Sequence, residues 1–180
     1  MHPNNRLLAV DLQTHCAVAL FCAEGRLLAV GSQPTRGDQA LKGAARSVLC
    51  AGDSLGWLVS AGAPACQATW ERVAMRQGVR VQRVGQPDWQ RDLLGDRAQG
   101  ASLDAATLAL AETVAERDGL AEAGQLSLDE ARAICIGLWA SQRAQQGVRL
   151  PALRSVSGVV ATASAHQPAG GKAGRLQRVA

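Results

Sequence analysis

The carboxylates at the ends of apolar stretches are the side chains of this sequence best placed to do chemistry. Asp11 ends the first apolar run, LLAVD, and Asp129 and Glu130 open the last long stretch with helical spacing, DEARAICIGLWAS. A carboxylate at the edge of an apolar sheet takes its role from its solvation and its neighbours. Each also has a structural interpretation: Asp11 can cap a turn, and acids suit the first turn of any helix. His15, in the turn after Asp11, either contacts a phosphate or a water, or is simply exposed.

A group of arginines offers a second kind of chemistry, the binding of phosphate. Four of them fall within one predicted helix and the strand that follows it: Arg72, Arg76, Arg80 and Arg83. Such a run can form an edge that faces nucleic acid. Four acidic residues between positions 71 and 96 weaken its field, so an ordinary arginine-rich surface is the alternative.

Length and composition suit one domain, residues 1–150, followed by a basic tail, residues 151–180. The chain has 180 residues, of which 47% are hydrophobic, enough for a single sizeable core. The tail holds 4 of the 19 basic residues and none of the 15 acidic ones, so it accounts for the formal net charge of +4. We expect it to be mostly disordered, and it either holds phosphates loosely or is only solvated.

The same composition argues against several classes of protein. No apolar run approaches the ~20 residues that span a bilayer, and the polar N-terminus is not that of a signal peptide. We therefore expect a cytoplasmic protein without a membrane partner. The five cysteines form no CxxC pair, which argues against a zinc ribbon or a redox motif.

The succession of apolar runs and turns predicts an α/β fold. Three runs between residues 6 and 32 indicate three strands joined by hairpin turns. Helices and short strands then follow: helix 38–51, strand 55–60, helix 64–77, strand 79–84, and helices 86–95, 103–117 and 128–145. Ser102 and Ser127 are placed to cap the last two helices. Because strand–helix–strand crossovers are right-handed in nearly all sheets, the fifth strand should run parallel to the fourth. The result is a five-stranded mixed sheet, three antiparallel then two parallel strands, flanked by helices.

This order of elements is that of the RNase H-like fold, and residues 6 to about 145 resemble the RuvC family of Holliday-junction resolvases and their phage relatives. Three matches carry the resemblance: the first strand ending in Asp11, the stretch PDWQRDLLG after the fifth strand, and DEARAICIGLWAS in the last helix. The resemblance implies two divalent metal ions, usually Mg²⁺, held by carboxylates from the first strand, the fourth strand and the last helix. By position, Asp11 and Asp129 match two of these ligands.

Two other positions depart from the family pattern. Ser60 stands where the family has a glutamate at the end of strand four, and Arg132 where the last helix has its second acid. A guanidinium there would repel metal ions and attract phosphate, or pair with Asp11 or Asp129 and fill the space of a metal. Glu130 is the first candidate to replace the lost acid, although one residue along a helix turns a side chain by about 100°.

We therefore expect a RuvC-like protein that binds nucleic acid, branched DNA by resemblance, with a degenerate site and weak or no nuclease activity. Arg132 joins the four arginines as a candidate nucleic-acid contact. One alternative is an active Mg²⁺-dependent, structure-selective endonuclease that uses Asp11, Asp129 and Glu130. Another is an assembly or scaffold protein that uses the fold for subunit contacts. The resemblance also implies a homodimer of phage or mobile-element origin.

Overall fold

A computed structural model describes residues 6–13, 15–34, 37–51, 55–95, 99–120 and 126–147. The predicted basic tail, residues 151–180, lies outside these ranges. Within them, no helix is long and apolar enough to cross a membrane.

A five-stranded sheet forms the centre of the molecule, in the order β3-β2-β1-β4-β5. Its strands are β1 (Arg6–Leu12), β2 (Cys16–Phe21), β3 (Leu27–Gln33), β4 (Leu55–Gly62) and β5 (Arg80–Arg83). The first three strands pair antiparallel, β4 pairs parallel to β1, and β5 pairs parallel to β4. The predicted mixed sheet is confirmed, with β4 two residues longer and β5 two residues shorter than the sequence indicated.

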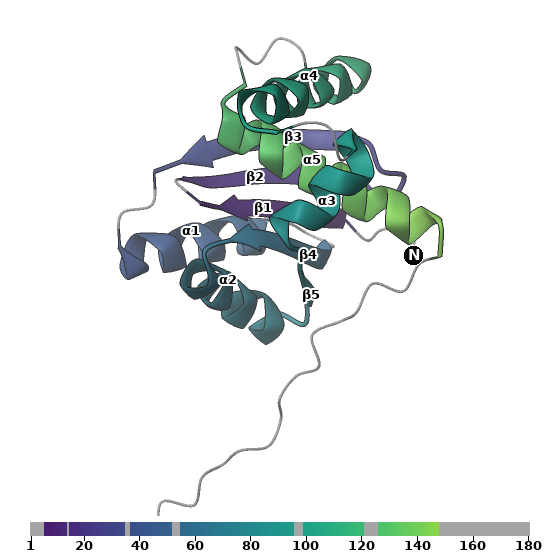
Figure 1. Ribbon diagram of the computed structural model, residues 1–180. Coiled ribbons are helices and arrows are strands. Elements are labelled where there is room, and N and C mark those ends of the chain that lie inside the picture. Colours follow the sequence, from purple (N-terminus) through teal and green to yellow (C-terminus); the bar gives the residue numbers. More distant parts are fainter. Residues whose placement is uncertain are drawn as a thin grey trace, which may run out of the picture.

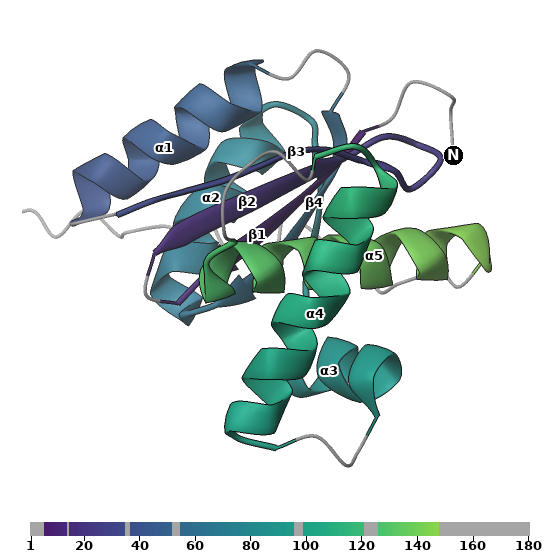
Figure 2. The same cartoon turned by 90° about the horizontal axis from the view of Figure 1, so that it is seen from above.

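Helices cover both faces of the sheet (Figures 1 and 2). On one face lie α1 (Asp38–Ala51) and α2 (Pro64–Arg76). On the other lies α5 (Leu128–Gln145), which packs on β1 and β2, with α3 (Gln86–Leu94) and α4 (Ala101–Arg117) packed against it. Thus α5 is the middle layer between the sheet and α4, and all residues from Ala133 to Ser141 are buried.

The alternation of side chains along β1 divides the core into two parts. Leu7 and Ala9 point towards α5, whereas Leu8 and Val10 point towards α1 and α2. A strand buried on both faces is apolar throughout, and β1 follows this rule at every inward position except its sixth residue, Asp11.

One glycine explains how closely α5 approaches the sheet. A Cβ added at Gly137 would lie 2.1 Å from Cε2 of Phe21, whose ring is fully buried on β2. Any side chain at this position would therefore push α5 off the strand that carries Phe21. The middle of α5 therefore packs directly on β2.

The helix starts agree with the sequence in one case and differ in another. Ser127 caps α5, and the Glu130 side chain bonds back to the Ser127 backbone, as the capping pattern predicted. The predicted cap by Ser102 is wrong, because α4 begins two residues earlier than expected, at Ala101 after Gly100. The Ser102 hydroxyl instead bonds the backbone of Gln99.

Candidate functional site

Asp11 is a buried carboxylate whose charge is poorly compensated. Its side chain is on the face of the sheet that α5 covers, the residue is 1% exposed, and neither carboxylate oxygen has a hydrogen bond of ordinary geometry among the described residues. Burial raises the pKa of Asp11 from 3.8 to about 7; Arg132 opposes this rise and Asp129 adds to it. Near neutral pH the group is therefore close to half ionised.

Arg132 lies beside this carboxylate and binds two other acids. From α5 its guanidinium reaches Oδ1 of Asp129 at 3.4 Å and Oδ1 of Asp104, in the first turn of α4, at 3.3 Å. Only 15% of the Arg132 side chain is exposed. The sequence offered Asp11 or Asp129 as the partner of Arg132, and the contact is with Asp129, while the charge of Arg132 lowers the pKa of Asp11. We refer to Asp11, Asp104, Asp129, Arg132 and His15 as the carboxylate cluster.

His15 occupies the remaining oxygen of Asp129. Its Nδ1 lies 2.8 Å from Oδ2 of Asp129, and its side chain is 46% exposed in the turn between β1 and β2. Both oxygens of Asp129 thus have a protein partner, His15 on one side and Arg132 on the other. Asp11 and Asp129, which the sequence grouped together, do share one neighbourhood through Arg132.

Glu130 is directed elsewhere, as the turn of the helix predicted. One of its oxygens accepts hydrogen bonds from the backbone N–H and hydroxyl of Ser127, and the other accepts one from Ser32 on β3 at 2.9 Å. Burial raises the pKa of Glu130, but these bonds bring it below its ordinary value. Its carboxylate is committed to the cap of α5 and to the edge strand, so we find no contact between Glu130 and the carboxylate cluster among the described residues.

The strand-four position requires a correction. The register pairs Val10 with Ser60 and Asp11 with Ala61, and paired residues point to the same face of a sheet. Ser60 therefore faces α1 and α2, on the side opposite Asp11, and the prediction that it occupies a ligand position is wrong by one residue. Ala61, 1% exposed and part of the core that contacts α5, stands beside Asp11.

The four arginines of α2 and β5 lie apart from the carboxylate cluster. Arg83 forms a double hydrogen bond with the buried Glu71, at 2.5 and 2.7 Å, and Arg80 lies over the ring of Trp57 at 5.4 Å. Arg72 and Arg76 are exposed on α2, which is on the opposite face of the sheet from α5. The sequence grouped these four with Arg132, but the sheet separates Arg72 and Arg76 from it.

The residues of the cluster do not fit a pair of divalent metal ions. Among the described residues, no three histidine, cysteine or acidic side chains are grouped so that they could hold a metal ion. Ala61 offers no ligand atom, and the guanidinium of Arg132 brings a fixed positive charge to the acids that would bind the ions. Two ions would have to displace it against charge repulsion.

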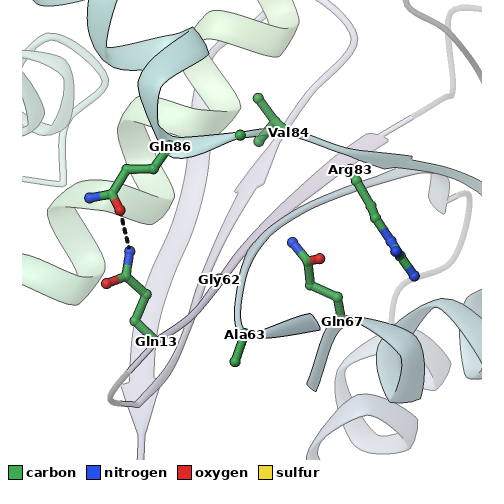
Figure 3. A pocket seen from close by; sticks show the side chains of 8 residues that line it. Gln13, Gly62, Ala63, Gln67, Arg83, Val84 and Gln86 are labelled. Atoms are coloured by element: carbon green, nitrogen blue, oxygen red, sulfur yellow. Dashed lines mark hydrogen bonds between the residues drawn. The ribbon is translucent and has the colours of Figure 1, made fainter. Parts of the chain in front are cut away.

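A cleft opens beyond the carboxyl ends of β1, β4 and β5 (Figure 3). Its volume is about 630 Å³. The lining residues come from the segments that follow these strands: Gln13, Gly62, Ala63, Gln67, Arg83, Val84, Gly85 and Gln86. At one end, the amides of Gln13 and Gln86 are hydrogen-bonded to each other at 3.0 Å. Sequence reasoning missed this cleft, and it also missed Asp104, because no motif marks residues that only the tertiary packing assembles.

Comparison with known proteins gives the fold a context. No protein-family model and no curated protein sequence matches the chain. Among solved structures, Thermus thermophilus RuvC matches with a TM-score of 0.61 and 17% identity over 79% of this chain and 97% of that one. The structure of T. thermophilus RuvC in complex with a Holliday-junction substrate matches with a TM-score of 0.57 and 16% identity, over 80% and 97% of the two chains. The chain therefore has a RuvC-like fold, as its sequence suggested.

Proposed function

We propose that this chain is a RuvC-like protein that binds branched DNA and has weak or no nuclease activity. The observation that carries the proposal is the position of Arg132, which contacts Asp129 and Asp104 and whose charge lowers the pKa of Asp11. A positive side chain stands among the acids that would have to hold the metal ions. The DNA part of the proposal is supported by the fold shared with a RuvC that was solved on a Holliday junction.

The electrostatics of the cluster support this view. The guanidinium of Arg132 neutralises the carboxylates of Asp129 and Asp104 without a metal ion. A buried charge is costly unless a group of opposite charge is paired with it. Asp11 receives too little of this compensation, since its pKa stays well above its ordinary value. Near neutral pH a proton therefore competes with Mg²⁺ for the Asp11 carboxylate.

The test is a labelled four-way junction, with a linear duplex of the same sequence as the control. We expect the chain to bind the junction more tightly than the duplex in a gel-shift assay, and to leave it intact in Mg²⁺ or Mn²⁺. If the natural chain cleaves the junction and the Asp11→Asn variant does not, the proposed loss of nuclease activity is contradicted. Absence of binding to either DNA would contradict the DNA part and favour an assembly or scaffold protein.

One observation favours the active endonuclease as the second candidate. Neither oxygen of Asp11 has a hydrogen bond of ordinary geometry among the described residues, and such orphaned acceptors are what a metal ligand shows before it binds its ion. In that case Arg132 would have to swing away from Asp129 when the ion enters. The junction assay in Mn²⁺ separates the two candidates directly.

A further inference from the structure

We infer that the cleft at the ends of β1, β4 and β5 binds an unpaired nucleobase. The inference rests on the proposed function and deepens it, because it names the part of the nucleic acid that this face of the protein would contact. Its volume of about 630 Å³ lies within the range of ligand sites, roughly 300 to 1,000 Å³.

The pair of glutamines at one end offers the hydrogen-bonding pattern of a base edge. The Nε2 of Gln13 donates to Oε1 of Gln86, which uses one half of each amide. Among the described residues the carbonyl oxygen of Gln13 and the amino group of Gln86 have no other partner. One free acceptor and one free donor therefore lie side by side. If the oxygen and nitrogen of both amides are exchanged, the pair still presents one free acceptor and one free donor. Glutamine amides bind base edges through such paired contacts.

Gln67 supplies a third amide on the floor of the cleft (Figure 3). It comes from the first turns of α2, it is 6% exposed, and its Nε2 donates to the backbone oxygen of Ser60 at 3.2 Å. This bond fixes the orientation of the amide. The Gln67 carbonyl oxygen has no protein partner among the described residues, so it remains an acceptor for a ligand.

The charge of the cleft favours a neutral ligand over a phosphate. Arg83 is the one charged residue among those that line it, and both oxygens of Glu71 already hold its guanidinium. Three amides and a neutralised arginine match a group with donors and acceptors but no net charge. A nucleobase has this chemistry, and the sugar and phosphate of the same nucleotide would remain outside.

The helix starts beside the cleft are also poor phosphate sites. Both α2 and α3 have a proline in their first two positions, which removes one backbone N–H from each. The backbone N–H of Ala63 donates to the Leu12 oxygen, and that of Gly85 donates to the carboxylate of Asp88. Each of these helix starts therefore offers fewer free N–H groups to an anion than a helix start without proline.

Side-chain amide signals in an NMR spectrum of the ¹⁵N-labelled full chain give a direct test. We expect the signals of Gln13, Gln67 and Gln86 to shift when adenosine is added at millimolar concentration, and to stay in place with ribose 5-phosphate. Equal shifts with ribose 5-phosphate would overturn the inference, because the cleft would then recognise the phosphate. No shift with adenosine would overturn it as well.

Variants connect the cleft to nucleic-acid binding. A duplex with one bulged adenosine is compared with the same duplex carrying an abasic site in the bulge. We expect the intact chain to bind the first roughly tenfold more tightly, and the double variant Gln13→Ala and Gln86→Ala to lose this difference. Gln90→Ala, on α3 but outside the cleft lining, is the matched control and should keep it. Equal binding of the two duplexes by the intact chain would refute the inference.

The two experiments separate this inference from the proposed function. If the glutamine signals respond to adenosine but the chain binds no DNA, the cleft stands and the proposed function fails. If the chain binds the four-way junction but the glutamine signals ignore adenosine, the proposed function stands and the cleft fails.

Discussion

Replacement of Asp11 by asparagine should stabilise the protein at alkaline pH and leave it almost unchanged at acid pH. Burial raises the pKa of Asp11 from 3.8 to about 7 in the folded chain, whereas an unfolded chain restores the ordinary value. Between these two values the folded state binds more protons than the unfolded state. Stability therefore falls as the pH rises through this window, and the whole penalty is present above about pH 7.

The size of the effect follows from the same pKa values. Each pH unit is worth about 1.4 kcal/mol, so the ionised Asp11 destabilises the fold by about 4 kcal/mol at most. The asparagine of the Asp11→Asn variant never ionises, but its amide is buried without partners, as the protonated carboxyl is. That cost is similar at all pH values. The informative quantity is therefore the change in unfolding free energy caused by Asp11→Asn at pH 8 minus the change it causes at pH 4. We expect this difference to favour the variant by several kcal/mol.

Urea unfolding of both proteins at the two pH values measures this quantity. Asp38→Asn is the matched control, because a hydrogen bond from Lys42 lowers the pKa of Asp38, so this variant should lose stability at pH 8 relative to pH 4. A stability change for Asp11→Asn that is the same at both pH values would refute the reasoning. It would mean that Asp11 is either solvated or compensated by Arg132 in full.

Three further predictions concern the cluster and the core. Arg132→Asp should create a third acid beside Asp11 and Asp129, and hence a site for Mn²⁺. In thermal unfolding, Mn²⁺ at 100 times its dissociation constant should stabilise this variant by about 2.7 kcal/mol and leave the natural chain unchanged. An equal response of both chains would contradict the poor fit of the natural cluster to metal ions. Gly137→Ala should destabilise the fold by roughly 1–3 kcal/mol in urea unfolding, since its Cβ overlaps the Phe21 ring, and unchanged stability would show that α5 can move off the sheet. Ser127→Ala should cost about 1 kcal/mol through the lost cap of α5, measured in the same way, and a cost near zero would indicate that water replaces the hydroxyl.

The sequence was sufficient for the fold because its signals are local. Apolar runs, prolines at helix starts and the capping pattern at Ser127 each act within a few residues, and together they predict the strands, the helices and their order. The parallel pairing of β5 with β4 also followed, since crossover connections have one hand. Ser102 shows the limit of such signals: a residue that commonly caps helices lies inside α4 instead, because Gly100 begins the turn.

The candidate site depended on information that the sequence does not carry. Asp11 and Asp129 were predicted to meet, since both belong to elements whose positions the fold determines. Ser60 was misplaced because a shift of one residue in strand register moves a side chain to the other face of the sheet. Asp104 was missed because its contact with Arg132 depends on how α4 packs on α5, and no pattern in either helix reports that packing.

Arg132 is the residue that separates DNA binding from metal-dependent cleavage as the function of the carboxylate cluster. Its guanidinium contacts Asp129 and Asp104, whereas the buried Asp11 has no hydrogen bond of ordinary geometry, so the charge of Asp11 is less well compensated than that of the other two acids. Buried, unpaired carboxylates are costly, and folds that need only stability replace them with apolar residues. Because the buried Asp11 carboxylate costs stability, we expect this end of the sheet to have a use beyond the stability of the fold.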